Sequence, residues 1–535
     1  MAGKQNQSID SSYDVVVIGG GNGGLGAALK LASKGVRTLL LEQHNVPGGF
    51  ATSFVRGRFE FEASLHELSS IGPADRKGGV RKFLEDESQC DIEWLPVPEA
   101  YRLILYGEGL DITLPFGIEA FKDTIAQRVP GSREAIDEYF DFCIDVSDAL
   151  EMMNRINKPP EKLLRDFTDF MKSSDKPARE IAENAKKMSR FLKTVPCTVD
   201  EVTKRFNLPD EAVKILYPYW CYLGIPMSRL SFTIWAAMLI DYMKYGAYVP
   251  RMRAQELANA MEARIRELGG HVEYNTMVER IIVRNGKVTG VETAAGDTIK
   301  TKQVICNASP TVAFNEMVYP KNEVPKIAYK YSNARKHGGS GFVLYLGLNK
   351  SPEELGIKDY GFFISKTMNT DDIYGSMNRL SNPDMQATIC LNNAVPDCSP
   401  PGTTIISFTT LFMMDTWKDV KPRDYFKLKN SIASDIIDVF ESSTGTRIRP
   451  HIEEIEVATP ATFSRYGNTY GGGIYGYELD PWDAPITRIL NMKNEQYIDG
   501  LTFAGGYSFI GHGFSSSILS GRAAGQIALK NLGGK

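Results

Sequence analysis

A glycine-rich turn near the start of the chain has the spacing that cradles a pyrophosphate. The apolar run 14–18 is followed at once by Gly19-Gly20-Gly21-Asn22-Gly23-Gly24 and then by a helix-like segment over residues 25–34. Gly19 can make the tight turn, Gly21 lets the backbone approach the phosphates, and Gly24 lets helix and strand pack closely. The N-terminus of the helix then faces the anion. The pattern predicts a strand, turn and helix that bind a dinucleotide.

An acidic residue after the next apolar run supports the same ligand. Residues 36–41 have the composition of a second strand, and this strand ends in Glu42, about 20 residues beyond the first glycine. A carboxylate there accepts hydrogen bonds from both ribose hydroxyls, which indicates an adenine dinucleotide without a 2′-phosphate. Gly48 and Gly49, after Pro47, offer a second close approach of the backbone.

Together these motifs resemble the FAD-binding N-terminus of the phytoene desaturase, carotenoid isomerase and retinol saturase family, relatives of the flavin amine oxidases. The similarity continues through residues 246–308 and the C-terminal segment 500–524. The resemblance implies FAD as the cofactor and places the backbone of Val278 at the adenine. The start of the C-terminal helix can hydrogen-bond the electron-rich edge of a reduced flavin, and the residues expected there are Gly505, Gly506, Gly513, Phe514 and Ser515.

Two histidines are candidate catalytic residues. His66 aligns with a histidine that saturase-type relatives carry near the flavin ring, although Ser64 stands where glycine is usual. As a general acid it could protonate a carbon beside a reduced double bond. His512 lies in the C-terminal flavin loop. For both, a buried histidine that serves only packing remains the alternative.

Further candidates lie in two segments that resemble the family's substrate tunnel. Tyr470 and Tyr475 could stack on a polyene and donate a proton, and Arg465 and Tyr466 are predicted to bind substrate. A glycine-rich turn with packed aromatic rings is the alternative. After Pro250, where the family has a basic residue and two glycines, this chain has Arg251-Met-Arg253.

The two arginines at this position lead to a hypothesis about the substrate. An arginine can clamp a carboxylate or phosphate through two hydrogen bonds. We therefore expect a long apolar substrate with an anionic head, such as an unsaturated fatty acid or a retinoid acid, rather than a fully apolar carotene. Solvated surface arginines are the alternative, since exposed arginines are common.

Because the N-terminal, central and C-terminal segments all resemble FAD-binding segments of the family, the resemblance implies an α/β fold. We expect a Rossmann-like FAD-binding domain assembled from the discontinuous segments 12–75, 250–312 and 488–535. A mixed-sheet substrate domain (76–118 and 313–487) and a helical subdomain (119–249) are inserted between them. Strand-like runs occupy 342–348, 387–391 and 404–412, and amphipathic helices are expected over 120–129, 133–153 and 209–219.

Composition excludes several classes of protein. The chain has 535 residues, 43% hydrophobic and 24% charged, which is typical of a globular protein. The formal net charge of −4 predicts no nucleic-acid partner. The seven cysteines are dispersed and never spaced as C-x-x-C, so we expect a reducing cytosol, no disulfide framework and no metal site.

The same survey gives expectations about membranes. The first twelve residues are polar and lack the apolar core of a secretory signal. The charge-free run 215–228 contains two prolines and is too short to span a bilayer. Residues 230–240 are apolar on nearly every face and form either a buried helix or one that enters lipid. We expect a cytoplasmic protein, with peripheral contact to the inner face of the membrane through residues 208–248.

The resemblance implies an FAD-dependent oxidoreductase or isomerase that saturates, desaturates or isomerises a carbon–carbon double bond in a carotenoid, retinoid or unsaturated fatty acid. Only one nucleotide-binding motif is found, so NAD(P)H, a quinone or oxygen would meet the flavin transiently. The direction, hydration included, the exact substrate and the oligomeric state stay open. A flavin amine oxidase and a non-catalytic flavin or lipid carrier remain as alternatives.

Overall fold

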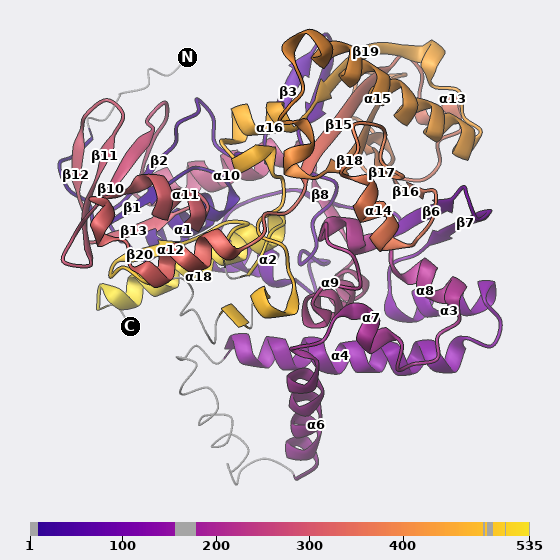
Figure 1. Cartoon of the computed structure of the whole chain (residues 1–535), viewed down its shortest axis with the longest axis horizontal. Helices are drawn as coiled ribbons and strands as arrows, with labels where there is room; N and C mark the ends of the chain where they lie inside the picture. Colours follow the sequence, from indigo (N-terminus) through magenta and orange to yellow (C-terminus); the bar gives the residue numbers. More distant parts are fainter. Residues whose placement is uncertain (1–8, 156–177, 485–486, 489–495, 509, 534–535) are drawn as a thin grey trace.

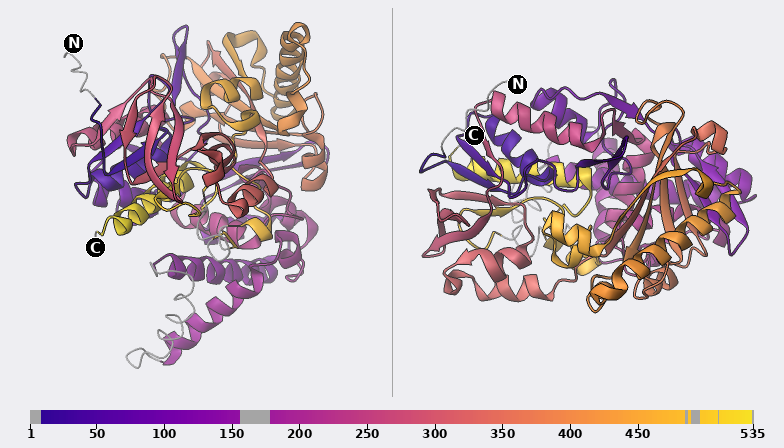
Figure 2. Two further views of the ribbon diagram at one scale, coloured as in Figure 1. Left: turned by 60° about the vertical axis from the view of Figure 1, so that its left-hand side comes forward. Right: turned by 90° about the horizontal axis from the view of Figure 1, so that it is seen from above.

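The structure is a computed structural model that describes residues 9–155, 178–484, 487–488, 496–508 and 510–533. Two parts rich in β-strands lie side by side, and a group of helices lies below them in the view of Figure 1. The two further views in Figure 2 show the same separation from the side and from above. The expected α/β class, with a parallel sheet and an inserted mixed sheet and helices, is confirmed.

A five-stranded parallel sheet joins three distant parts of the chain. Its order is β20 (Leu501–Phe503), β13 (Gln303–Cys306), β1 (Val15–Ile18), β2 (Thr38–Leu41) and β9 (His271–Glu273). Parallel strands buried on both faces are expected to be continuously apolar, and β1 and β2 are buried at every residue.

Helices cover one face of this sheet and a second sheet covers the other. The helices are α1 (Asn22–Ala32), α10 (Arg253–Glu267) and α18 (Phe514–Asn531), and they share a hydrophobic core with alternate residues of β1. The covering sheet has the order β12 (Thr298–Lys300), β11 (Lys287–Thr293), β10 (Val278–Arg284) and β14 (Val318–Tyr319).

Glycines let α1 and α18 pack with their backbones nearly in contact. A Cβ at Gly521 would lie 2.1 Å from the carbonyl oxygen of Gly23, and one at Gly26 would lie 2.7 Å from that of Ile518. Gly24 has the role expected for it, because a Cβ there would lie 1.8 Å from the carbonyl oxygen of Gly19. A side chain at Gly26 or Gly521 would push α18 away from α1, and one at Gly24 would push α1 away from the turn that precedes it.

The second β-rich part is a seven-stranded mixed sheet. Its outer face packs on α15 (Pro422–Thr444). The predicted strands 342–348, 387–391 and 404–412 correspond to β15, β17 and β18, with boundaries shifted by at most two residues at each end. The order is β19 (Ile452–Ala458), β15 (Ser340–Leu348), β18 (Thr404–Phe412), β17 (Met385–Cys390), β16 (Gly361–Ser365), β6 (Tyr101–Leu105) and β7 (Leu110–Leu114).

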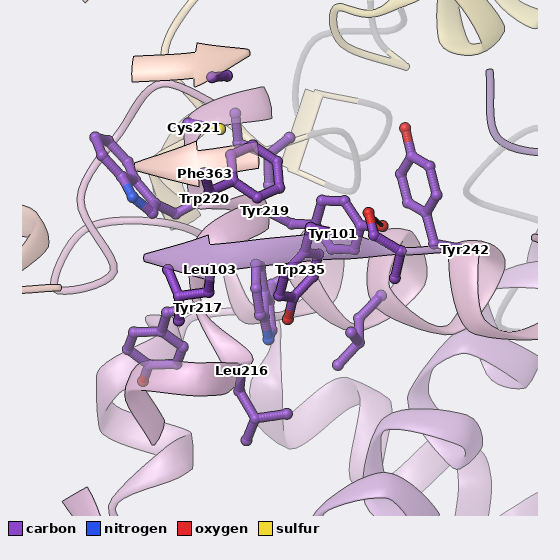
Figure 3. Packing of buried hydrophobic residues seen from close by; sticks show 14 of the residues in the cluster. Tyr101, Leu103, Leu216, Tyr217, Tyr219, Trp220, Cys221, Trp235, Tyr242 and Phe363 are labelled. Carbon is purple, nitrogen blue, oxygen red and sulfur yellow. Dashed lines mark hydrogen bonds between the residues drawn. The ribbon is translucent and has the colours of Figure 1, made fainter. Parts of the chain in front are cut away.

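The inner face of this sheet meets the helical part of the chain. Figure 3 shows aromatic side chains from β6, from residues 217–220 and from α9 packed together, and the rings of Tyr219 and Tyr242 are stacked with centroids 4.7 Å apart. The predicted helix over 209–219 ends at Leu216, because Pro218 cannot donate a helical hydrogen bond. The helices are α3 (Ile118–Arg128), α4 (Arg133–Arg155), α6 (Ala178–Thr194), α7 (Val199–Thr203), α8 (Asp210–Leu216) and α9 (Phe232–Tyr245).

Shorter elements connect these parts. β3 and β4 form a hairpin, and β5 pairs with β8. Their bounds, with those of the short helices, are β3 (Ser53–Arg56), β4 (Phe59–Glu62), β5 (Trp94–Pro96), β8 (Tyr248–Pro250), α2 (Gly79–Arg81), α11 (Pro310–Val312), α12 (Lys326–Ala334), α13 (Pro352–Leu355), α14 (Thr370–Ser376) and α16 (Pro460–Gly467).

The apolar segment 230–240 is a buried helix in α9. Trp235 and Leu239 are fully buried, and Ile234 and Met238 on the remaining face line an internal cavity. Residues 208–248 contribute none of the large apolar side chains that are exposed on the surface. Among the described helices, none is long and apolar enough to cross a bilayer.

Candidate functional site

A cavity of about 2510 Å³ lies where the three parts of the fold meet. Its wall is built from the glycine turn before α1, the loop after β20, the start of α18, one face of α9, and the segment 456–479. Single small-molecule sites usually occupy roughly 300–1000 Å³. The cavity therefore has room for a dinucleotide and for a second, elongated ligand.

The glycine turn forms one end of the cavity. Gly19 has φ 91°, and both Gly19 and Gly21 line the wall. The Gly48 N–H donates to the Gly20 carbonyl at 2.8 Å, which brings the second glycine turn beside the first. Helix α1 begins without a side-chain cap and without an acidic residue in its first turn. Its first N–H groups thus form a site for a phosphate.

Glu42 lies at the position expected for a ribose contact. One carboxylate oxygen accepts from the Gly20 N–H at 2.5 Å and the other from the His44 N–H at 2.7 Å. A carboxylate offers about four acceptor positions, so each oxygen keeps capacity for a hydroxyl. The side chain is 8% exposed and lines the cavity. Val278, the expected adenine neighbour, also lines it.

The C-terminal loop faces the same space. Gly505 (φ 84°) and Gly506 follow β20, and Gly513 (φ 110°) precedes α18, which again begins without a side-chain cap. The predicted residues Gly505, Gly506, Gly513, Phe514 and Ser515 all line the cavity. A second uncapped helix N-terminus therefore points its positive dipole end at this space.

Sequence reasoning missed Asn307, which follows β13. A Cβ added at Gly21 would lie 2.9 Å from the side-chain amide of Asn307, and one added at Gly23 would lie 2.5 Å from it. A Cβ added at Gly505 would lie 2.2 Å from the same amide. The Asn307 side chain thus lies between the two glycine loops. Its position directly after an apolar strand was the available signal, because polar residues at the carboxyl ends of parallel strands meet the ligand.

His66 lies on the cavity wall beside the substrate sheet. Its Nε2 is 2.9 Å from the hydroxyl of Thr409, and the Tyr360 hydroxyl donates to its carbonyl oxygen. Burial lowers the pKa of His66 to about 4. The imidazole is therefore neutral near pH 7, and the role of His66 as a general acid stays a prediction.

His512 and Tyr475 lie against each other on the opposite loop. Their ring centroids are 4.7 Å apart. Burial, together with the positive charge of Arg488, lowers the pKa of His512 to about 4. The Tyr475 hydroxyl donates to the carbonyl of Cys221, and burial raises the pKa of this phenol well above its ordinary value. The pair thus presents neutral rings to the cavity.

The remaining tunnel residues are at the rim. Tyr466 is 61% exposed and Tyr470 is 55% exposed, while the guanidinium of the exposed Arg465 lies 5.8 Å from the centre of the Tyr466 ring. All three line the opening of the cavity. They are placed to meet a ligand as it enters.

Arg251 and Arg253 do not line the cavity. Arg251 pairs with Asp397 at 2.5 Å on the surface. Arg253 is 8% exposed and pairs with the Glu60 carboxylate at 3.2 Å, while it also donates to the Glu60 and Cys398 carbonyls. These contacts occupy both guanidinium groups, so the structure gives Arg253 a role in holding the β3–β4 hairpin.

Glu67 and Tyr222, two further residues of the cavity wall, were not predicted from the sequence. Glu67, next to His66, is 8% exposed, and the Tyr222 hydroxyl interacts with its carboxyl group. Both residues line the cavity. An acid directly after a candidate histidine was a visible signal, but its burial depends on helices far away in the chain.

No group of three or more metal-ligating side chains is found within the described ranges. The seven cysteines are all free thiols, and six of them are buried.

The family model for flavin containing amine oxidoreductases matches residues 23–529. An all-trans-retinol 13,14-reductase from Danio rerio is 28% identical over 88% of this chain and 78% of its own length. A chloroplastic prolycopene isomerase from Daucus carota is 25% identical over 95% of this chain and 78% of its own length.

Solved structures share the fold. An oxidoreductase from Methanosarcina mazei superimposes with a TM-score of 0.60 at 15% identity, over 95% of this chain and 99% of that one. Cyclohexylamine oxidase from Brevibacterium oxydans gives 0.60 at 13% identity, over 98% of this chain and 100% of that one. At such identities the likeness shows the fold alone.

The residues fit a flavin nucleotide as the cofactor. One continuous cavity is bordered by the uncapped N-termini of two helices, α1 and α18. Its wall also includes glycine turns, which let a ligand approach the backbone closely, and Glu42. The match covers most of the chain and includes four of the five strands of the parallel sheet, while β1 lies before its first residue. This protein belongs to the family of flavin containing amine oxidoreductases, with a flavin as its cofactor.

Proposed function

We propose that this protein is an FAD-dependent enzyme that acts on a carbon–carbon double bond in a long apolar substrate of the retinoid or carotenoid class. The observation that carries the proposal is the continuous cavity that leads from the dinucleotide cradle into an apolar chamber. The chamber wall includes Leu65, Leu223, Ile234, Met238 and Ile474. Such a wall suits a hydrocarbon chain, and the relatives named above support the substrate class through their own names.

FAD would be held at both ends by this chain's own groups. The first turn of α1 would bind the pyrophosphate, Glu42 the ribose, and the backbone of Val278 the adenine. Gly505, Gly506 and the start of α18 would border the flavin ring. When bound, the flavin supplies hydride or electron transfer.

The protein's part in the reaction is to position the polyene and to exclude water. The rings of Tyr475 and His512 form one side of the chamber, and His66 with Thr409 forms another. Because both histidines are neutral near pH 7, they can hydrogen-bond but do not place a positive charge beside the hydrocarbon. Arg465, Tyr466 and Tyr470 at the rim would receive a polar head group.

The domain division expected from the sequence remains part of this proposal. The segments 12–75, 250–312 and 488–535 would form the FAD-binding domain, and each of them supplies strands to the parallel sheet. NAD(P)H, a quinone or oxygen would exchange electrons with the flavin. A cytoplasmic protein that contacts a membrane surface is consistent with a substrate that dissolves in lipid.

Product analysis tests the proposal. The FAD-loaded protein is incubated without oxygen with a panel of retinoids, carotenoids and unsaturated fatty acids, with and without chemically reduced flavin. A gain of two hydrogens identifies a saturase, a loss of two a desaturase, and an unchanged mass with altered retention an isomerase. If no polyene changes while amines yield peroxide in the presence of oxygen, the protein is an amine oxidase and the proposal is wrong.

A further inference from the structure

We propose that Glu67 is a catalytic residue of this chain, a neutral carboxylic acid that donates a proton to a carbon of the polyene. The inference rests on the proposed function, because it assigns a residue to the double-bond chemistry. It goes beyond the candidates from the sequence, which did not include this residue.

The position of Glu67 is the first support. It lines the large cavity together with its neighbour His66 and with Tyr222, whose hydroxyl interacts with the carboxyl group. The ring of Tyr222 lies 5.9 Å from that of His66, so the three side chains form one cluster. Glu67 Oε1 is buried and has no hydrogen-bond partner in the described structure. A buried carboxyl oxygen without a partner is costly, unless a ligand meets it.

The surroundings keep this carboxyl group uncharged. Burial, with the negative charge of Glu99 added, raises the pKa of Glu67 well above its ordinary value, and the Tyr222 hydroxyl offsets only part of this. No Lys or Arg side chain is among the groups that shift the pKa of Glu67. The titratable groups that surround it are Glu99, His66, Tyr219, Tyr222, Tyr242, Tyr360 and Cys221. A protonated carboxyl keeps one O–H donor, which can be transferred.

Three other groups on the wall that could carry a proton are less suited. Burial raises the pKa of Asp241, but its carboxylate accepts from the Ser70 hydroxyl at 2.7 Å, and this contact with those to Ser69 and the Ser70 backbone offsets part of the rise. Tyr475 has its O–H committed to the carbonyl of Cys221. His66 is neutral and shares Nε2 with Thr409. Glu67 therefore combines a transferable proton with an open position.

The step balances in either of two reactions. In a saturation, one carbon of the double bond accepts a hydride from a reduced flavin, and the π electron pair forms a C–H bond to the neighbouring carbon with the Glu67 proton. The electron pair of the broken O–H bond stays on Glu67, which becomes a carboxylate. Water then reprotonates it. In an isomerisation, the same proton is added, the weakened double bond rotates, and Glu67 takes the proton back, with no net change in electrons.

The test compares Glu67→Gln with Glu62→Gln. Both glutamates are 8% exposed, but Glu62 does not line the large cavity and accepts from the Ala254 N–H, which a glutamine oxygen can also do. Because general acids contribute about 10²–10⁴-fold, we expect E67Q to lower kcat by at least about 100-fold with little change in KM. E62Q is expected to stay within about threefold of wild type, and Glu67→Asp is expected to recover part of the rate.

A second readout does not depend on turnover. The infrared difference spectrum of wild type minus E67Q at pH 7, recorded on the flavin-loaded protein without substrate, should contain the C=O stretch of a protonated carboxylic acid. If that band is absent, or if E67Q keeps the wild-type rate on a polyene, Glu67 is not the proton donor. If wild type itself changes no polyene, the proposed function is wrong, and that outcome is distinct from an active wild type with an equally active E67Q.

Discussion

The hydroxyl of Thr409, on the substrate sheet, lies 2.9 Å from Nε2 of His66, in the loop that follows the first hairpin. The two residues are 343 positions apart in the chain. The Tyr345 hydroxyl donates to the carbonyl of Ala63 at 2.5 Å and that of Tyr360 to the carbonyl of His66. Three contacts from the substrate part thus hold this loop at the place where the dinucleotide cradle meets the apolar chamber.

His66 is expected to stay neutral over the physiological range. Burial disfavours the imidazolium and lowers its pKa to about 4, whereas an unperturbed histidine titrates near 6.5. In ¹⁵N-histidine NMR spectra, the His66 ring signals, assigned by their loss in His66→Gln, should not shift between pH 5.5 and 8. The urea-unfolded protein is the control, and a midpoint near 6.5 in the folded state would contradict the assignment.

Glu42 is expected to contribute strongly to flavin binding. Glu42→Ala removes the acceptor for the ribose and leaves the Gly20 and His44 N–H groups without their carboxylate. Because a hydrogen bond to a charged group contributes about 1.5–3 kcal/mol, Kd for FAD should rise roughly 10-fold to 150-fold in calorimetry of the apoprotein. Glu273→Ala, at the end of the adjacent strand but off the cavity wall, should bind FAD as wild type does.

Two helical glycines should respond to alanine in opposite ways. Gly24→Ala would place a Cβ 1.8 Å from the carbonyl oxygen of Gly19, so α1 must shift and both FAD affinity and Tm should fall. Overpacking of this kind costs about 1–3 kcal/mol. Gly375→Ala, in α14, meets nothing within 4 Å and should be neutral or stabilise by up to about 1 kcal/mol. Equal Tm values for the two variants would disprove the packing argument.

Glu62 should make the protein less stable as the pH rises. Burial raises its pKa from 4.5 to about 8, with the positive charge of Arg253 lowering it in part. Between these values the folded state holds a proton that the unfolded state has released, so the free energy of unfolding falls by about 1.4 kcal/mol per pH unit. Glu62→Gln removes this dependence, and its Tm should fall less than that of wild type from pH 5.5 to 7.5. Parallel curves would refute the assignment.

Arg253 should matter for stability and not for the head group of the substrate. It is buried, pairs with Glu60 and lies outside the cavity wall. Arg253→Ala leaves the two backbone carbonyls without their donor, which should cost about 2–4 kcal/mol. The ratio of affinities for a fatty acid and its neutral alcohol should stay as in wild type. A changed ratio would restore the head-group hypothesis made from the sequence, and Arg465→Ala at the rim is the matched variant expected to change it.

Elements whose cause lies within a short stretch of chain were predictable. The glycine turn, Glu42 and the strands near 342–348 and 404–412 follow from local spacing, apolar runs and the backbone freedom of glycine. The role of Gly24 was also accessible, because close packing of helix on strand is part of the same motif.

Other features depended on contacts between distant segments. The apolar run 230–240 could not be assigned to the core or to lipid, because its surroundings are supplied by other helices and by the cavity. Arg253 was predicted to lie near the substrate because it follows Pro250 in the sequence. In the fold it instead contacts Glu60 in the β3–β4 hairpin and the carbonyl of Cys398. The helix expected to reach residue 219 was ended by Pro218, a local signal that could have been used.

The sequence by itself determined the flavin cradle, since a phosphate-binding turn is a local arrangement of backbone N–H groups that glycine spacing encodes. The protonation of His66 and Glu67 was decided only by the tertiary structure. A pKa depends on how completely water is removed and on which charges lie nearby. Here the water is excluded by α9, by the substrate sheet and by the C-terminal loop, which are far apart in the chain.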